Sequence, residues 1–586
     1  MFDFSKTLFY LKKGVAAVLS VILLTSAASS GSNWWITDSK FSVSYHGCRD
    51  SIFSVYSYSF ADSTEKINST APLGRKSNQT VYLAKGEGEY AQIAIRSKYY
   101  RGNSFISVGE MTNAAGDKLE TELYWEYETE ASDGTGFELY PDALVPVSNP
   151  YNFRCLKETN YVFLIKIKTT AETKPGDYSA TISFGSAGAN GNKHETSSAK
   201  LNVHVWNFEV SESDIMRTAV GLSKSLINAL YKAFDMDITN EQLQQLYIDY
   251  YEMMLDHNIS CYDLPYSILD SRADAYMSDP RVKSFCVPYT ENESTLRQYY
   301  DKLSQNEEWL AKAYFYPIDE PKTQEQLDRY VEITNYLSRV WPGYKMVTPF
   351  CADKTEAVDA QGNAIYNSII QTNKSTIICP VTYLINDSVG MLDRLYQRQA
   401  NGEEFWWYVC CGPRPNSDYC NLFVQFPGFR TRILFWQQYD YNVTGFLFWS
   451  SNYWYTGSPT GWEVNALTKI WRNSRTTEFT GYDTYGDGFL MYPGVKGFSL
   501  ESRRFLSLSE YEFDRNMPVS SLRLELISDG IEDYAYLKMA ERLIGKDKTD
   551  KILSKVTSDL THYTYSDSTF ANARLELGNA IERASK

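Results

Sequence analysis

The sequence predicts an N-terminal β-sandwich followed by a (β/α)8 barrel that carries additional C-terminal helices. The first observation is that residues 30–209 hold only strand-like runs between turn signals. The second is that, from Arg217 onward, short apolar runs alternate with helix-length segments eight times. The third is a pair of neighbouring carboxylates at the end of the fourth of these runs, where barrel enzymes carry reactive groups.

Length and composition restrict the classes of protein that need to be considered. The chain has 586 residues, of which 43% are hydrophobic and 22% charged, as in globular proteins rather than disordered or fibrous ones. The formal net charge is −15, and no basic stripe offsets it, so phosphate backbones are repelled. We therefore expect no nucleic acid partner, and the composition does not predict an oligomeric state.

The N-terminus has the pattern of a targeting segment. Lys12 and Lys13 precede an apolar run at 15–24 that is short for a bilayer span, and small residues follow at 26–28. This pattern predicts a signal peptide over residues 1–28, with an uncleaved anchor as the alternative. We therefore expect a mature chain exported to the periplasm or the extracellular space. No later apolar run is long enough for a membrane helix.

Residues 30–209 form the predicted sandwich domain. The strand-like runs in it are FSVSY, SIFSVYSYSF, QTVYLAKGEGEYAQIAIRS, ELYWEYETE, NYVFLIKIKTT, DYSATISF and KLNVHVWNFEV. In the last of them, alternation places Leu201, Val203, Val205 and Asn207 on one face. Alternation of this kind is typical of a strand with one buried face.

Residues 212–586 form the predicted catalytic barrel with its helical extension. The eight candidate strands are TAVGL near 218, ISCYDL near 259, VKSFCVPY near 282, AKAYFYPI near 311, KMVTPF near 345, STIICPV near 375, FWWYVCC near 405 and TGFLFWS near 444. Helix-length segments with 3.6-residue periodicity separate most of them, and residues 518–585 are predicted to be helical as well.

The stretch YFYPIDEP, residues 314–321, ends the fourth candidate strand. Asp319 and Glu320 are either acids that cap the next helix or a catalytic pair at a strand end. Pro321 should keep Glu320 extended. Two adjacent acids repel each other, so partial burial raises the pKa of the more desolvated one. Their place after the fourth strand favours catalysis.

Other catalytic chemistries lack their residues. Only five histidines occur, none near the end of a predicted barrel strand, and there is no GxSxG or HExxH motif. None of the nine cysteines has CxxC spacing, so we expect neither a metal site nor a cofactor. Carboxylates remain as acid and base, which indicates glycoside hydrolysis. Acids from one strand end, rather than from two strands, suit substrate assistance by a 2-acetamido group.

At the level of longer motifs, the chain resembles glycoside hydrolase family 123, the β-N-acetylgalactosaminidases. The matching stretches are KGEGEYAQIAI, YPDALVP, KPGDYSATISF, VHVWNF, YFYPIDEP, WWYVCCGP, GFLFWSSNYW and LRLELISDGIEDYAYL. The resemblance implies that Asp319 positions and polarises the acetamido group and that Glu320 is the general acid/base. It further implies an oxazolinium intermediate, net retention, a terminal β-linked N-acetylgalactosamine as substrate, and no metal.

Aromatic residues near three strand ends are predicted to bind the substrate. Trp407 and Tyr408 lie at the end of the seventh strand and Trp449 at the end of the eighth, while Tyr316 and Tyr383 are candidate donors to the acetamide oxygen. Because side chains alternate along a strand, about half of the strand-end aromatics should pack outside the pocket. The charged residues of the motif LRLELISDGIEDYAYL are interpreted as structural. A hydrolase of another β-glycoside, such as a β-N-acetylglucosaminide, and a non-catalytic glycan-binding protein are the alternatives.

Overall fold

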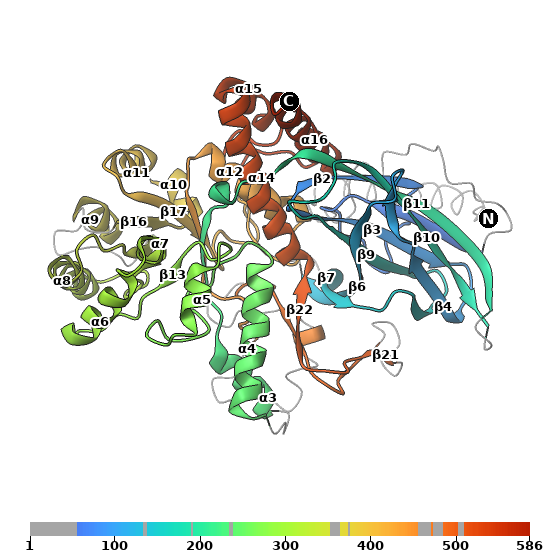
Figure 1. Cartoon of the computed structure of the whole chain (residues 1–586), viewed down its shortest axis with the longest axis horizontal. Coiled ribbons are helices and arrows are strands. Elements are labelled where there is room, and N and C mark those ends of the chain that lie inside the picture. Colours follow the sequence, from blue (N-terminus) through green and yellow to red (C-terminus); the bar gives the residue numbers. More distant parts are fainter. Residues whose placement is uncertain are drawn as a thin grey trace, which may run out of the picture.

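The computed structural model describes residues 55–132, 137–188, 192–233, 238–351, 364–372, 376–388, 390–454, 470–472, 484–501 and 509–586. The predicted signal peptide, residues 1–28, lies outside them. Figure 1 shows strands of the N-terminal region at one end of the molecule, an α/β region at the other, and the C-terminal helices between and above them. Among the described residues, no helix is both long and apolar enough to cross a membrane.

Two antiparallel layers form the N-terminal region, as the sequence predicts. One layer runs β1-β3-β9-β6-β7 and the other β2-β11-β10-β4-β8, with β2 parallel to β11, and β5 pairs with both β6 and β10. Their bounds are β1 Tyr56–Ala61, β2 Asn78–Lys85, β3 Gly88–Ser97, β4 Arg101–Val108, β5 Met111–Asn113, β6 Lys118–Ser132, β7 Phe137–Pro146, β8 Tyr151–Cys155, β9 Asn160–Lys168, β10 Gly176–Ala187 and β11 Lys193–Glu209.

The predicted alternation in β11 holds only as far as Val205. Leu201, Val203 and Val205 are buried, but Asn207 is exposed and Trp206 is buried instead. The register against β2 shifts between Val205 and Glu209, which turns Trp206 toward the C-terminal helices. The prediction for Asn207 is therefore wrong, because packing against a distant helix changes the face that is buried.

The eight predicted barrel strands follow one another around a closed ring in the part of the chain that the structure describes. Their bounds are β12 Arg217–Val220, β13 Phe285–Cys286, β14 Ala313–Tyr314, β15 Val347–Phe350, β16 Ile377–Pro380, β17 Glu404–Val409 and β18 Gly445–Phe448, with the second strand reduced to a bridge at Cys261. Most neighbouring strands are connected by parallel pairing, and β18 pairs with β12 to complete the ring. The remaining connections are a bridge between Phe315 and Met346, and a hydrogen bond from Cys286 N to Tyr262 O. These strand pairs and bridges are parallel, as in a (β/α)8 barrel.

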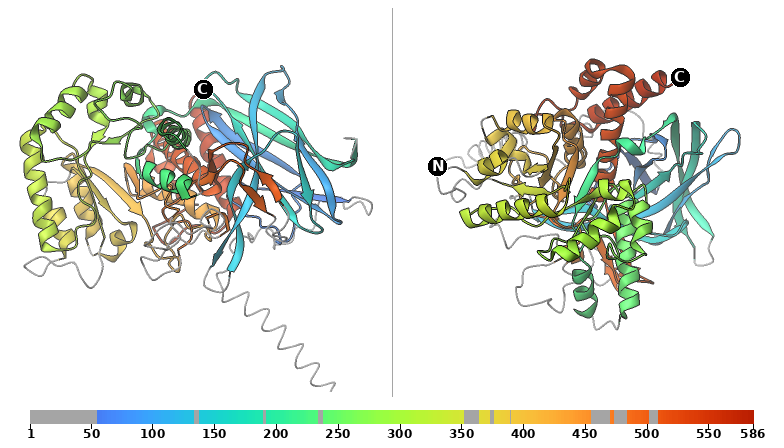
Figure 2. Two further views of the ribbon diagram at one scale, coloured as in Figure 1. Left: turned by 90° about the horizontal axis from the view of Figure 1, so that it is seen from below. Right: turned by 60° about the vertical axis from the view of Figure 1, so that its left-hand side comes forward.

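Helices surround this ring, as Figure 2 shows from two further sides. They are α3 Lys224–Ala233, α4 Asn240–Leu255, α5 Ala273–Ser278, α6 Glu293–Leu303, α7 Glu307–Lys312, α8 Gln324–Val340, α9 Ile365–Thr372, α10 Thr382–Asp387, α11 Met391–Ala400 and α12 Gly428–Asp440. A 3-10 turn, η1 Glu212–Asp214, precedes β12. After the barrel come β19 Tyr492–Gly494, β20 Ser499–Glu501, β21 Ser509–Glu512, β22 Met517–Ser521, α14 Leu522–Ile544, α15 Lys546–Leu553 and α16 Asp567–Ala584.

The C-terminal segments join the two regions. β22 pairs with β7 of the sandwich, and α14 packs against the barrel helix α12. Arg523 of α14 pairs with Asp142 of β7, with 2.8 Å between Nε and Oδ1, and both side chains are fully buried. Arg432 of α12 pairs with Asp533 at 2.7 Å and with Asp529 at 3.0 Å. The charged residues of this motif thus make buried contacts between elements, which agrees with their structural interpretation.

Candidate active site

Asp319 and Glu320 lie at the carboxyl end of β14, the fourth barrel strand. The helix that follows, α8, is capped by Thr323, whose hydroxyl accepts from Gln326 N while the Gln326 side chain accepts from Thr323 N. This reciprocal pair satisfies the first turn of the helix without help from either acid. The alternative that Asp319 and Glu320 serve as helix caps is therefore removed by the structure.

The backbone of Glu320 is left-handed, with φ of +39°, and not extended as the following proline predicts. The prediction is wrong because a proline excludes right-handed helical geometry in the preceding residue but does not exclude the left-handed region. A side chain other than glycine rarely adopts this conformation, which costs about 1–3 kcal/mol. The turn between β14 and α8 thus holds Glu320 in a strained conformation, as is common at functional sites.

Glu320 contacts side chains from its own turn and from other barrel strands. Its Oε1 accepts a hydrogen bond from the hydroxyl of Tyr408 on β17, and its Oε2 lies 3.0 Å from Nζ of Lys322. Burial by itself lowers the pKa of Lys322, but the charge of Glu320 outweighs this and the pKa is raised. Beside Glu320, desolvation raises the pKa of the Cys351 thiol to about 12, and the negative charge of Glu320 adds to that shift. Cys351 is therefore a protonated neighbour of the carboxylate.

Asp319 has a different partner. Its Oδ1 accepts a hydrogen bond of 2.7 Å from the hydroxyl of Tyr316. The residue is exposed at the barrel mouth, yet protein surrounds the carboxyl closely enough that desolvation is the largest effect on its pKa, which is raised. The hydrogen bond from Tyr316 opposes this shift, and the charge of Glu320 adds to it. The two neighbouring acids are therefore held by separate tyrosines in unlike environments.

The structure brings some of the predicted aromatic residues to the dyad and not others. Tyr408 and Tyr316 bond directly to the two carboxylates. Tyr383, on α10, is half-buried beside Gly412, and Glu320 contributes to the raised pKa of its hydroxyl after desolvation. Its predicted donation to an acetamide oxygen stays a prediction.

Trp407 points away from the barrel mouth. It neighbours Tyr408 on β17, so its side chain is on the opposite face of the strand. The indole is fully buried, with its ring centroid 6.1 Å from that of Tyr441 at the end of α12. The prediction that Trp407 contacts the sugar does not fit this placement, because strand alternation turns it toward the helices.

A cavity of about 540 Å³ opens at the mouth beside the dyad. It is lined by residues that follow β12, the second strand, β13 and β18, among them Tyr262, Asp263 and Trp449. Tyr262 lines the cavity, and its ring packs edge-to-face on that of Tyr316, the partner of Asp319, with 5.4 Å between the ring centroids. Sequence reasoning singled out Trp449 but missed Tyr262 and Asp263. The available signal was YDLP, in which an acid lies shortly before a proline at a strand end, as in IDEP.

The part of the chain that contains this site matches a known family. Residues 246–514 match the model of the glycoside hydrolase 123 catalytic domain, a range that includes Asp319, Glu320, Tyr408 and Trp449. The chain carries a family 123 glycoside hydrolase domain. A solved family 123 glycoside hydrolase from Clostridium perfringens is 16% identical, with a TM-score of 0.61 over 90% of this chain and 98% of that one, which shows a common fold.

Two smaller solved structures overlap only a part of the chain. The PapD-like domain 7 of human CEP192 is 10% identical over 27% of this chain and 88% of that chain, with a TM-score of 0.15. The CooA pilin subunit from enterotoxigenic Escherichia coli is 10% identical over 25% of this chain and 96% of that chain, with a TM-score of 0.16. No curated protein sequence matches this chain.

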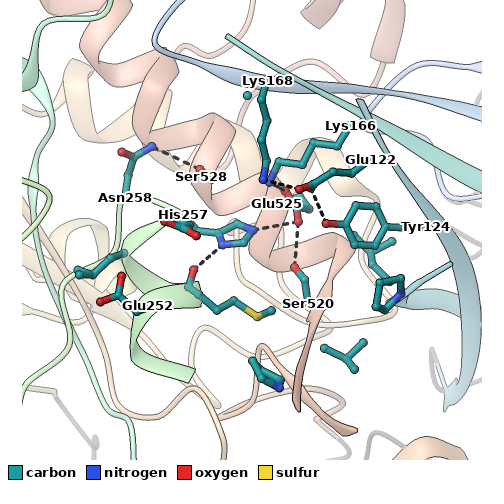
Figure 3. A pocket seen from close by; sticks show the side chains of 18 of the residues that line it. Glu122, Tyr124, Lys166, Lys168, Glu252, His257, Asn258, Ser520, Glu525 and Ser528 are labelled. Atoms are coloured by element: carbon teal, nitrogen blue, oxygen red, sulfur yellow. Dashed lines mark hydrogen bonds and ion pairs between the residues drawn. The ribbon is translucent and has the colours of Figure 1, made fainter. Parts of the chain in front are cut away.

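A larger cavity of the glycoside hydrolase, about 810 Å³, lies between the sandwich, α4 and α14. Figure 3 shows Glu525 bonded to His257 and Ser520. Glu525 lies 2.7 Å from Lys166 Nζ and 2.9 Å from His257 Nε2, and it accepts from Ser520. Burial alone would raise the pKa of Glu525, but the charges of His257 and Lys166 hold it well below its usual range. This network joins three elements and lies apart from the dyad.

Among the described residues, no group of three or more histidine, cysteine or acidic residues is arranged to hold a metal ion. The eight cysteines that the structure describes are unpaired, and most are packed among apolar side chains. Asp319 and Glu320 are carboxyl groups at the mouth, a residue type that serves in acid–base catalysis.

Proposed function

We propose that this enzyme is a retaining exo-glycoside hydrolase that removes terminal β-linked N-acetylgalactosamine by substrate-assisted catalysis. The observation that carries the proposal is the adjacent carboxyl pair at the end of β14, in which neither acid caps α8 and each is bonded to its own tyrosine. In most retaining enzymes a nucleophile and an acid from two different strands flank the glycosidic bond, and two neighbouring acids at one strand end cannot take these positions. They suit one acid for the leaving group and one for the acetamide.

In this mechanism the protonated form of Glu320 donates its proton to the glycosidic oxygen while the acetamide oxygen of the substrate attacks the anomeric carbon. The bond to the aglycone breaks, the alcohol leaves, and an oxazolinium ion forms. Asp319 accepts a hydrogen bond from the acetamide N–H and stabilises the positive charge that develops there. Glu320 then takes a proton from the water that opens the ring at the anomeric carbon, and the sugar is released with its β configuration retained.

Contacts around each carboxylate support this division of roles. Desolvation of Asp319 strengthens its interaction with a cation, because electrostatic attraction grows as water is excluded. Glu320, by contrast, is flanked by Tyr408, Lys322 and Cys351. These neighbours, together with the strained backbone, fix its carboxyl above the mouth.

The substrate class rests on the family and on its relative. The solved Clostridium perfringens enzyme is described in relation to glycolipid glycan hydrolysis. We propose terminal N-acetylgalactosamine of oligosaccharides or glycolipid-type glycans as the substrate here, with the half-exposed Trp449 in contact with the sugar. Given the N-terminal segment, we propose that the enzyme acts after export.

A leaving-group series separates the two roles. On 4-nitrophenyl and methyl β-N-acetylgalactosaminides, Glu320→Gln should lose at least about 1000-fold on the methyl glycoside and far less on the nitrophenyl one, which needs no protonation. Asp319→Asn should lower kcat about 100-fold or more on both glycosides, because Asp319 acts on the acetamide group and not on the leaving group. Glu325→Gln, in the first turn of α8, is the control and should retain full activity.

Four results would contradict the proposal. Equal losses for Glu320→Gln on both leaving groups would remove its role as the acid. Turnover of a 2-hydroxy sugar at the rate of the 2-acetamido one would exclude substrate assistance. Exclusive activity on the gluco epimer would make the enzyme a β-N-acetylglucosaminidase, and binding without turnover would favour a glycan-binding protein.

A further inference from the structure

The 540 Å³ cavity beside the dyad has walls from four consecutive or adjoining strand ends. Residues 221–225 follow β12, residues 262–268 follow the second strand, Cys286 ends β13 with Pro288 shortly after it, and Trp449 follows β18. These are the carboxyl ends of the barrel strands, the face on which such barrels bind substrates. The cavity adjoins the predicted catalytic pair on this face.

Trp449 lines the cavity, and contacts on the side away from the cavity fix the position of its indole. Its Nε1 donates to Asp487 Oδ1 at 2.9 Å, and its ring lies 4.9 Å from that of Tyr453. Gly488, with φ of +79°, packs so closely that an added Cβ would come within 2.1 Å of the indole. The indole is only half-buried, so its free face is a rigid, apolar surface turned to solvent. Such faces pack against the C–H groups of pyranose rings.

Asp263 lines the same cavity and has no partner in the described chain. Its carboxylate makes no hydrogen bond or ion pair with any described residue, and it is exposed to the cavity. The nearby Lys224 does not neutralise it, since its ammonium donates to Gln244 Oε1. Desolvation nonetheless raises the pKa of Asp263. A carboxylate that is partly desolvated without donors is unfavourable unless a ligand or water supplies them.

Two rings in contact connect the cavity to the dyad: Tyr262 lines the cavity, and Tyr316 does not. Tyr262, the residue before Asp263, packs edge-to-face on Tyr316, and the Tyr316 hydroxyl bonds to Asp319. Desolvation raises the pKa of the half-buried Tyr262 hydroxyl, and the negative charge of Asp319 adds to that shift. Asp263 is thus connected to Asp319 through these two rings, and a sugar that lay across Tyr262 with its anomeric carbon at the dyad would present its opposite ring edge to Asp263.

We propose that Asp263 is a specificity-determining residue, which accepts hydrogen bonds from the hydroxyl groups at the ring edge remote from the scissile bond, including the C4 hydroxyl, while Trp449 stacks on the ring. The proposal rests on the proposed function and deepens it. An acceptor-only carboxylate can bind two neighbouring hydroxyls at once. The interface cavity does not compete as a sugar site, because its Lys166, Lys168, Glu122 and Glu525 are bonded to one another.

The test uses Asp263→Asn and Asp263→Ala in the full-length enzyme, with Asp270→Asn as the matched control. Asp270 belongs to the same connecting segment, is paired with Arg272 and does not line the cavity. The readouts are kcat and KM on the 4-nitrophenyl galacto and gluco N-acetyl glycosides, and the affinity for free N-acetylgalactosamine and N-acetylglucosamine by NMR titration. The binding measurement remains informative even if no glycoside is hydrolysed.

Loss of hydrogen bonds to a charged acceptor predicts that Asp263→Ala raises KM and weakens sugar binding about 10- to 100-fold, with a smaller change in kcat. Asp263→Asn should lose less, and both should alter the ratio of kcat/KM between the C4 epimers. Thermal unfolding should be unchanged, which separates this role from a structural one.

Two outcomes would overturn the inference, and they differ from failure of the proposed function. If wild type turns over the glycosides and Asp263→Ala keeps the same KM, sugar affinity and epimer ratio, Asp263 does not recognise the sugar although the hydrolase function stands. If both Asp263 variants and the Asp270→Asn control lose affinity equally, the effect is not specific to the cavity. If wild type binds the sugar without turnover and Asp263→Ala binds it at least tenfold more weakly, the inference stands while the proposed hydrolase function fails.

Discussion

Carboxylates are frequent both at the interface between sandwich and barrel and at the mouth of the barrel. Their surroundings in the two places are opposite. At the interface Glu525 is bonded to a lysine, a histidine and a serine, and its pKa is held low. At the mouth, Asp319 accepts one hydrogen bond, from a tyrosine hydroxyl, and Asp263 has no partner among the described residues. Desolvation raises the pKa of both carboxyl groups. Compensated charges hold elements together, and uncompensated ones are left for a ligand.

The sharpest way to break this comparison is to remove a cation from the interface. Arg432 is buried with Asp533, Asp529 and Glu89 around it, so Arg432→Met should lower the free energy of unfolding by about 3–5 kcal/mol. Urea denaturation followed by intrinsic fluorescence measures this, and kcat per folded molecule should be unchanged.

The exposed pair of Arg297 and Glu293 supplies the control. Arg297→Met should change stability by less than about 1 kcal/mol. Should Arg432→Met fail to fold, Arg432→Lys, which keeps one charge, should fold with an intermediate loss. An unchanged stability in either Arg432 variant would show that the interface charges are not structural.

A second prediction concerns Asp487, whose only described side-chain donor is Trp449 and whose burial raises its pKa to about 6. The folded state therefore binds a proton more tightly than the unfolded one, so this group opposes folding at neutral pH. Its contribution recovers as pH falls through 6 toward 4. Asp487→Asn keeps an acceptor for Trp449 and should stabilise the enzyme by about 2–3 kcal/mol at pH 7.

The measurement is the difference in unfolding free energy between wild type and Asp487→Asn at pH 7 and pH 5. The advantage of the variant should shrink at the lower pH, because the wild-type carboxyl is by then protonated. A difference that is the same at both values would show that Asp487 does not titrate in this range.

Tyr408 tests the mouth directly. Tyr408→Phe removes the hydrogen bond to Glu320 and should lower kcat about 10- to 100-fold with little effect on KM, because a bond to a charged group is lost. Steady-state kinetics on a methyl glycoside, which needs protonation, is the measurement. Tyr231→Phe, which loses a buried bond to Gly494 O, is the control and should affect stability but not kcat. Equal kcat values for Tyr408→Phe and wild type would show that Tyr408 does not position the acid.

The smallest effect is expected at Tyr316. Its hydrogen bond lowers the pKa of Asp319 against desolvation, so Tyr316→Phe should raise that pKa further. Since the proposed role needs the ionised form, the acidic limb of the pH profile of kcat/KM should move to higher pH, by less than about one unit. A shift to lower pH, or none, would contradict the assignment of that limb to Asp319.

Local sequence patterns were sufficient to predict the order of elements. The period of two in the N-terminal half and the eightfold alternation after Arg217 report which faces are buried, and this depends on neighbours a few residues away. The same reasoning placed Asp319 and Glu320 at the fourth strand end.

Only the tertiary structure decided which charges are compensated. The partners of Glu320 and Glu525 lie 88 and 268 residues away, at Tyr408 and His257, and no periodic pattern connects such positions. The left-handed backbone of Glu320, the outward side of Trp407 and the unpaired Asp263 likewise follow from how separate strands and helices meet. Sequence alone determined where acids lie along the chain, whereas packing determined which of them remain available to a sugar, because pKa and hydrogen bonding depend on surroundings assembled from distant residues.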